Sequence, residues 1–161
     1  MSDGEQPYGP GRGAPPTRLS PERLDSFLAA NRMGALATVK RDGHPHMSTV
    51  AYQWNSGERL ISIGSTADRL KVRQLRRDPH AALYVSSADH LTFAVAEGVA
   101  EVSPVSAVPG DAVGLDMLAM FPEFDNLDDR PKFLANMVED RRVVITLRVT
   151  KLYGDTLSGD S

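Results

Sequence analysis

Short runs of apolar residues, most of them alternating with polar residues, cover much of the chain. They span residues 34–40, 46–53, 60–63, 81–85, 91–102 and 142–153, and turn residues separate them. Alternation with a period of two predicts strands that bury one face. Asp42 and Gly43 separate the first two runs and residues 55–57 the next two, which predicts hairpins and antiparallel pairing. Gly98 predicts a bulge or bend in the fifth strand.

Helical patterns lie between some of these strands. Ser20 and Pro21 form a typical helix start, and the apolar stripe after them predicts a helix that ends near Asn31. The basic segment after residue 64 is predicted to form a helix that ends before Pro79, because proline disfavours helical geometry in the residue before it. Further helices are predicted at residues 111–120 and 131–139, with a loop at residues 121–130.

Together these elements predict a mainly β protein with short helices. About six strands with few protected edges favour a closed antiparallel barrel. Residues 1–18 contain four glycines and four prolines and are predicted to be a disordered tail. Residues 19–154 are then one folded domain, and residues 155–161 a C-terminal tail.

Composition narrows the class of protein further. The chain has 161 residues, a formal net charge of −3 and no cysteine. The charge argues against a general nucleic-acid binder, and the absence of cysteine excludes disulfides and thiolate sites. No apolar run is long enough to cross a bilayer, and no signal peptide is visible. We therefore expect a cytoplasmic protein that acts on small molecules.

Positive charge is concentrated in residues 65–77, S-T-A-D-R-L-K-V-R-Q-L-R-R. Ser65 and Thr66 are predicted N-caps of the basic helix, and a strand, a hydroxyl-rich turn and a basic helix start favour phosphate binding. Helical residues are about 100° apart, so Arg69 and Lys71 can reach one phosphate only if Arg69 lies in the turn and the helix begins near Leu70. The alternative is a solvated basic helix without a ligand.

Other chemistries find little support in the sequence. Neither Gly-x-Ser-x-Gly nor Gly-x-Gly-x-x-Gly occurs. His44 and His46 share a strand face but have no carboxylate beside them, so we predict no metal site. No catalytic side chain is predicted either. A bound cofactor would therefore have to supply any chemistry.

Four segments in order resemble a known family: residues 34–50, 65–79, 94–102 and 141–154. They are similar to the flavin/deazaflavin split β-barrel family, related to pyridoxamine 5′-phosphate oxidase, and within it to the actinobacterial F420-dependent oxidoreductases. The resemblance implies a six-stranded antiparallel split β-barrel and a homodimer with cofactor sites between the subunits. The implied cofactor is coenzyme F420, with FMN as the alternative.

The resemblance also implies roles for particular residues. The backbone of one strand, at Ser48, Thr49 and Val50, would face the ring of the cofactor, and the end of the next strand, at Ser65 and Thr66, would lie along it. Arg69 and Lys71, with the amide of Gln74, would hold its phosphate. The long fifth strand of the other subunit would cover the ring with Leu91 and Phe93.

The expected function is F420-dependent hydride transfer to a small organic acceptor. The chain lacks the Arg-containing C-terminal segment of the true pyridoxamine phosphate oxidases, which argues against vitamin B6 oxidation. The polyglutamate tail of F420 could meet nearby arginines, namely Arg73, Arg76 and Arg77. An FMN enzyme, a non-catalytic flavin or F420 carrier and a haem-binding relative remain alternatives. The candidate haem ligands are His44, His46, His80 and His90.

Overall fold

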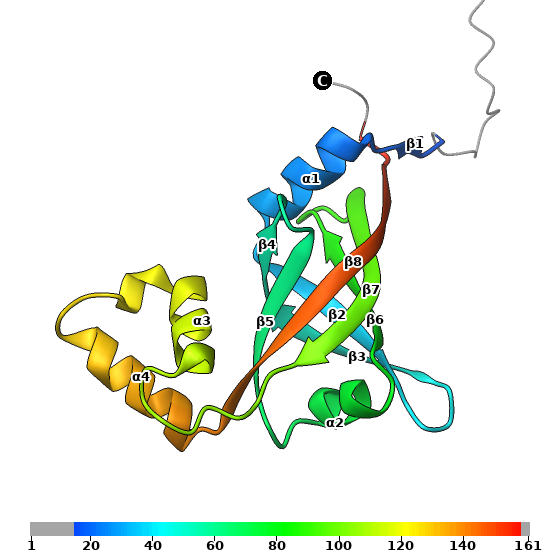
Figure 1. Cartoon of the computed structure of the whole chain (residues 1–161). Helices are drawn as coiled ribbons and strands as arrows, with labels where there is room; N and C mark the ends of the chain where they lie inside the picture. Colours follow the sequence, from blue (N-terminus) through cyan, green and yellow to red (C-terminus); the bar gives the residue numbers. More distant parts are fainter. Residues whose placement is uncertain (1–14, 159–161) are drawn as a thin grey trace, which may run out of the picture.

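The structure is a computed structural model that describes residues 15–158 (Figure 1). The strands are β1 (Thr17–Arg18), β2 (Met33–Val39), β3 (Pro45–Ala51), β4 (Gln53–Asn55), β5 (Leu60–Thr66), β6 (His80–Ser86), β7 (Thr92–Val102) and β8 (Arg142–Thr156). The helices are α1 (Pro21–Ala30), α2 (Leu70–Arg77), α3 (Ala112–Met120), the 3₁₀ helix η1 (Pro122–Phe124) and α4 (Asp129–Glu139). The short helices and the dominance of strands confirm a mainly β fold.

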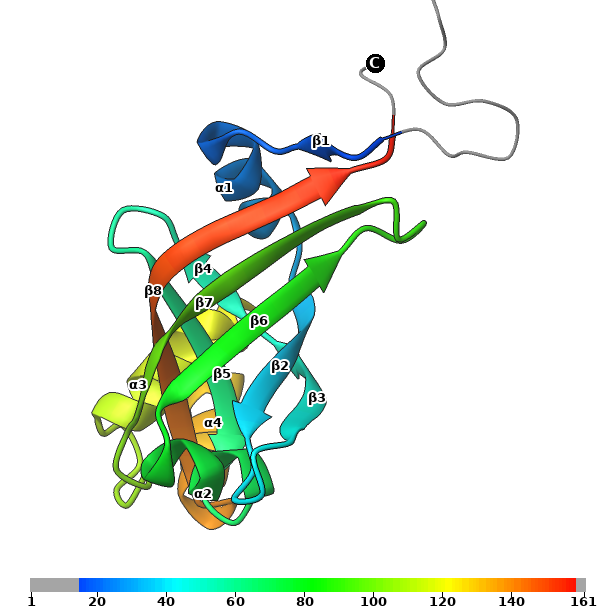
Figure 2. The same ribbon diagram turned by 90° about the vertical axis from the view of Figure 1, so that its right-hand side faces the viewer.

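All strands of the described chain join one curled antiparallel sheet. Its order is β3-β2-β6-β7-β8-β5-β4, and β1 pairs with β8. Figure 2 shows β8, β7, β6 and β2 side by side across it. The expectation of a closed barrel is wrong, because β3 and β4 end the strand order and no ladder joins them within residues 15–158. β3 nevertheless packs near β5, and we call this boundary the seam. The split barrel is thus confirmed.

The strand count exceeds the predicted six for two physical reasons. The predicted strand at residues 46–53 is two strands, because Tyr52 turns inward and its hydroxyl donates to the Leu28 carbonyl at 2.7 Å. Thr17 and Thr156 pair at the start of β1 and the end of β8. Two ends of the predicted tails are therefore strand instead: residues 17–18 form β1, and residues 155–156 belong to β8. The rest of the prediction for residues 1–14 and 159–161 lies outside the described residues.

The helices follow the predicted pattern with one correction. Ser20 caps α1, accepting a hydrogen bond from the Arg23 backbone at 3.2 Å, as the sequence predicted. The predicted loop at residues 121–130 contains η1 and the first turn of α4. The Asn126 side chain accepts from the Asp129 backbone N–H at 2.9 Å, which starts the last helix before its proline. Among the described residues no helix is long and apolar enough to cross a membrane.

Two apolar clusters hold the fold together. The larger lies inside the curled sheet and includes the fully buried side chains of Leu28, Leu36 and Ile145. The smaller lies outside the sheet, where Met117 and Met137 bring α3 and α4 against β8. Figure 1 shows this helical pair on the flank of the barrel and α2 at one end. The candidate site lies at this end of the barrel, where α2 and the seam meet.

Candidate functional site

The start of α2 confirms one geometric prediction and corrects another. Arg69 has extended geometry (φ −66°, ψ 142°) and lies just before the helix, which begins at Leu70 as predicted. Ser65 and Thr66 do not cap this helix. They end β5 and pair with β8, because the apolar run of β8 extends the ladder to the last residue of β5. The basic segment is therefore a strand end, a three-residue turn and a helix.

Lys71 extends from α2 to β3, on one side of the seam. Its Nζ donates to Ser48 Oγ on β3 at 3.4 Å. Burial lowers the pKa of Lys71, and the positive charge of Arg69 lowers this pKa further. Among residues 15–158, neither Arg69 nor Lys71 has a carboxylate oxygen within ion-pair distance. Two neighbouring cations without a paired carboxylate provide a site that an anion would stabilise.

The hydroxyls beside this cation pair have different roles. Ser65 Oγ is buried and has no hydrogen-bond partner within the described part of the chain. Thr66 Oγ1 donates to Asp68 Oδ1 at 2.7 Å, and this bond is the largest cause of the lowered pKa of Asp68. The Asp68 carboxylate is thus held by Thr66, whereas the buried Ser65 hydroxyl keeps an unused hydrogen-bonding capacity in the described chain.

β3 offers backbone as well as side chains to the seam. It pairs with β2 and ends the strand order of the described sheet, so its other edge carries free N–H and C=O groups. Along it, Ser48 is half-buried, Thr49 is exposed and Val50 is buried. Thr49 therefore lies on the outer face, opposite to its two neighbours. This arrangement fits the predicted backbone contacts to a ring.

The remaining predicted residues do not gather at the cation pair. Gln74 is buried, and its Oε1 accepts a hydrogen bond from Thr38 at 2.5 Å. Leu91 precedes β7, and Phe93 stacks on Tyr84 with 5.6 Å between ring centroids. Both lie at the start of β7, whereas α2 contacts the region just after its end. Within one chain Leu91 and Phe93 are therefore not brought to α2, and the predicted phosphate role of Gln74 stays a prediction.

The other basic side chains of α2 donate to backbone carbonyls. Arg73 bonds the carbonyl of Asp68 at 3.2 Å and Arg76 that of Ser103 at 3.2 Å. Arg77 bonds the carbonyl of Val39 at 2.6 Å. These contacts fix the guanidinium groups around the exposed side of the helix. Their predicted contact with a polyglutamate tail stays a prediction.

The histidines named in the sequence lie in unrelated surroundings. The expectation that His44 has no carboxylate beside it is wrong, because the Asp42 side chain folds back onto it at 3.3 Å; His80 lies beside Asp78 at 2.7 Å. His46 Nδ1 is buried without a hydrogen-bond partner in the described residues. Residues 15–158 contain no group of three or more side chains that could hold a metal ion.

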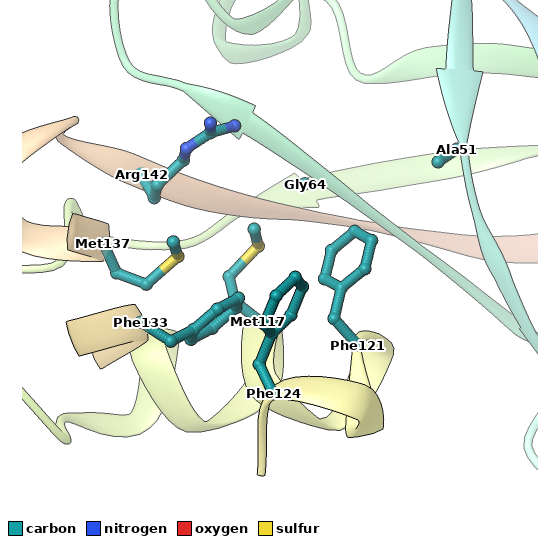
Figure 3. Close-up of a pocket in the computed structure, with 8 residues that line it drawn as sticks. All are labelled: Ala51, Gly64, Met117, Phe121, Phe124, Phe133, Met137 and Arg142. Carbon is teal, nitrogen blue, oxygen red and sulfur yellow. The ribbon is translucent and has the colours of Figure 1, made fainter. Parts of the chain in front are cut away.

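The sequence analysis missed a pocket of about 230 Å³ beside the site (Figure 3). Its walls come from the sheet, α3, η1 and α4, and its residues are Ala51, Gly64, Met117, Phe121, Phe124, Phe133, Met137 and Arg142. One signal could have indicated it: three of the five phenylalanines of the chain fall within residues 121–133. Their arrangement around one pocket with Arg142 depends on tertiary packing, which no local pattern carries.

The fold and this site define a split-barrel protein of the flavin-related class. The family model described as pyridoxamine 5′-phosphate oxidase matches residues 20–153, and the chain belongs to this oxidoreductase-like split-barrel family. A solved F420 reductase is 27% identical, with 83% of this chain and 98% of that chain covered and a TM-score of 0.63.

Two other solved structures share the fold. A conserved hypothetical protein from Mycobacterium tuberculosis is 22% identical, with 89% of this chain and 91% of that chain covered and a TM-score of 0.69. An FAD-binding protein from Mesorhizobium loti is 19% identical, with 89% and 97% covered and a TM-score of 0.61. At these identities the likeness concerns the fold alone.

Proposed function

We propose that the protein is an F420-dependent oxidoreductase that reduces a small organic acceptor. The observation that carries the proposal is the pair of cations Arg69 and Lys71 at the start of α2, which has no paired carboxylate within residues 15–158 and from which Lys71 reaches Ser48 on β3. The likeness to an F420 reductase at 27% identity supports the choice of deazaflavin. A phosphate-bearing cofactor would neutralise the pair and accept its hydrogen bonds.

The residues present fit such a cofactor. Arg69 and Lys71 would hold its phosphate, and Ser65, whose hydroxyl is buried without a partner, would donate to an oxygen beside it. The free edge of β3 would bond the polar groups of the ring. These groups bind and orient the cofactor and the curled sheet limits access of water, so that positioning is the contribution of the protein.

When bound, reduced F420 would supply a hydride from its C5 to one atom of an activated double bond, the neighbouring atom taking a proton from solvent, and would leave oxidised. No side chain of the chain is assigned to this proton transfer. The described residues therefore act as binding and orienting groups, and the Lys71 ammonium has an electrostatic role at the phosphate.

A homodimer belongs to this proposal. Leu91 is 42% exposed at the start of β7, away from the cation pair of its own chain. A second copy would bring its Leu91 and Phe93 to the ring and complete the site. Light scattering during gel filtration tests this, and a monomer at micromolar concentration in the presence of F420 would contradict it.

The decisive experiment is a paired fluorescence titration of the purified protein with F420 and with FMN. Tight F420 binding with weak FMN binding supports the proposal. The reverse preference would favour an FMN enzyme, which the family description makes the second candidate. Binding of neither would contradict both, and F420 binding without reduction of any tested acceptor would favour a carrier.

Lys71→Ala tests the phosphate assignment directly. Loss of a charged hydrogen bond costs on the order of 1–3 kcal/mol, so the F420 dissociation constant should rise by about fivefold to 150-fold. Lys151→Ala is the matched control, because Lys151 is exposed on β8 and lies over the Tyr153 ring at 5.4 Å. An unchanged dissociation constant in Lys71→Ala would remove the assignment.

A further inference from the structure

The pocket beside the site has an aromatic side. Phe124 and Phe133 are stacked, with 5.5 Å between ring centroids and 23° between their planes. Phe121 is tilted by 49° against Phe133 at 6.4 Å. Phe124 remains 41% exposed, so this side of the pocket opens to solvent. Ring faces and edges in this arrangement favour a planar apolar ligand.

The same pocket has a cationic side. Arg142 lines it from the start of β8, away from the three phenylalanine rings (Figure 3). The Nε of Arg142 is buried without a hydrogen-bond partner in the described residues. A terminal nitrogen of Arg142 forms an ion pair with Asp140 Oδ2 at 3.6 Å, a distance too long for a hydrogen bond. An arginine whose one ion pair is long and whose Nε–H has no acceptor in the described residues is suited to bind a further carboxylate.

The sheet side of the pocket continues into the predicted cofactor residues. Arg142 pairs with Thr66 in the β5–β8 register, and paired residues point to the same face. Gly64 lies two residues before Thr66 on this face, and Ala51 lies two residues after Thr49 on β3. Two residues of a strand span about 7 Å, so a ligand in the pocket would lie next to the proposed ring position.

The size of the pocket limits the ligand. At about 230 Å³, it exceeds the cavity of roughly 150 Å³ that accommodates benzene. It is smaller than the roughly 300 Å³ at which sites for drug-sized molecules begin. One ring with a conjugated side chain, or two fused rings, would fill it.

We propose that this pocket binds a planar aromatic or conjugated carboxylate of one or two rings. Its carboxylate pairs with Arg142, and its apolar part lies among Phe121, Phe124 and Phe133. The identification of this ligand as the hydride acceptor rests on the proposed function, whereas its binding does not require a cofactor. The pocket thus defines a substrate class for the site at the seam.

The probe is 2-naphthoate, and its neutral isostere 2-naphthamide is the ligand control. Both are titrated into the whole chain without cofactor, followed by calorimetry and by the NMR signals of the methionine methyl groups. Naphthoate should bind at least about tenfold more tightly, since hydrogen bonds to a charged group are the stronger ones. Signals of Met117 and Met137 should shift, and those of the exposed Met33 and Met47 should not.

Matched variants assign the charge effect. Arg142→Met should abolish the preference for naphthoate over naphthamide, and Arg142→Lys should retain part of it. Arg148→Met changes an exposed arginine on the same strand and should leave the preference intact. Phe124→Ala removes an exposed ring and should weaken both ligands. Equal affinity of wild-type protein for the two ligands, or an unchanged preference in Arg142→Met, overturns the proposal.

An F420 titration of Arg142→Met separates the two proposals. Unchanged F420 affinity together with lost naphthoate preference supports a distinct acceptor pocket. Loss of F420 affinity with unchanged naphthoate binding overturns it, since Arg142 would then belong to the cofactor site. Naphthoate binding with the expected methyl shifts in a protein that binds no F420 would support the pocket and refute the proposed function.

Discussion

Thr38 Oγ1 donates a hydrogen bond to Gln74 Oε1 across 2.5 Å, and both side chains are buried. Thr38 belongs to β2 and Gln74 to α2, so this bond connects the sheet to the helix that carries Lys71. A buried polar pair is costly to break on one side only, because the other partner loses water without gaining a bond. The position of Lys71 therefore depends on this contact between β2 and α2.

Thr38→Val should lower the free energy of unfolding by about 1–3 kcal/mol, because it leaves the Gln74 amide oxygen buried without its donor. Urea unfolding measures the change. Adding Gln74→Leu to Thr38→Val should recover part of the loss, since the double variant has no unpaired polar group at this position. If the double variant recovers none of the lost unfolding free energy, the pair contributes through its shape and not through the hydrogen bond.

The same variants test the predicted phosphate role of Gln74. If its only role is to fix α2, Gln74→Leu and Thr38→Val should weaken F420 binding to a similar extent. A much larger loss in Gln74→Leu would show direct contact with the cofactor.

Gly98 lies at a close approach of β7 and β8. The register of this pair shifts between Glu97 and Gly98, which confirms the bulge that the glycine predicted. A Cβ at Gly98 would lie 2.0 Å from the Arg148 carbonyl oxygen. Gly98→Ala should therefore lower the free energy of unfolding by about 1–3 kcal/mol, because the backbone of β7 or β8 must move to make room for the Cβ. Thermal unfolding measures this effect.

Gly57→Ala is the control for this substitution. A Cβ there meets only the Asn55 side chain, at 3.7 Å. Its melting temperature should stay close to that of the unmodified protein. Equal stability of the two alanine variants would contradict the close approach of β7 and β8.

Asp111 caps α3 and should make stability depend on pH. Hydrogen bonds from the Gly114 and Ala107 backbones, then from Val108 and Ser106, lower its pKa from 3.8 to about 2. Since the pKa is lower in the folded protein, this stabilisation is present above pH 3.8 and is lost as pH falls through about 2. Asp111→Ala should cost roughly 0.5–2 kcal/mol at neutral pH, as for other helix caps.

Urea unfolding at about pH 7 and about pH 3 checks the direction. Asp111→Asn keeps an acceptor oxygen but cannot titrate, so its stability should fall less than that of the unmodified protein over this range. The unmodified chain also carries other carboxylates with lowered pKa, so the difference between the two proteins is the quantity to compare. An equal loss of unfolding free energy between the two pH values in both proteins would refute the role of Asp111.

Local geometry was the most reliable guide in the sequence. The 100° spacing of helical residues predicted that Arg69 lies outside the helix, and the helix indeed begins at Leu70. The N-cap preference of Ser65 and Thr66 failed, because pairing with β8 decided their conformation. A propensity is a weak local preference, and a distant strand in register outweighs it.

Features assembled from distant segments could not be predicted. β1 exists only through its pairing with the far end of β8. The pocket brings Arg142 together with Phe124 of η1, Phe133 of α4 and Phe121 between α3 and η1, and only packing of the α3–α4 pair on the sheet places them there. The roles of Leu91 and Phe93 depend on a second copy, so they remain predictions after one chain is described.

Ser65 connects stability to the proposed function. Its buried hydroxyl has no partner in the described chain, and such a group costs about 1–3 kcal/mol in folding. Ser65→Ala should therefore leave the cofactor-free protein equally stable or more stable by up to about 1 kcal/mol, while F420 affinity falls severalfold. Ser106→Ala is the control, because that buried hydroxyl donates to Asp111 Oδ1 at 3.0 Å and its loss should destabilise. If Ser65→Ala destabilises the free protein as much as Ser106→Ala does, then the Ser65 hydroxyl is already satisfied and does not await a ligand.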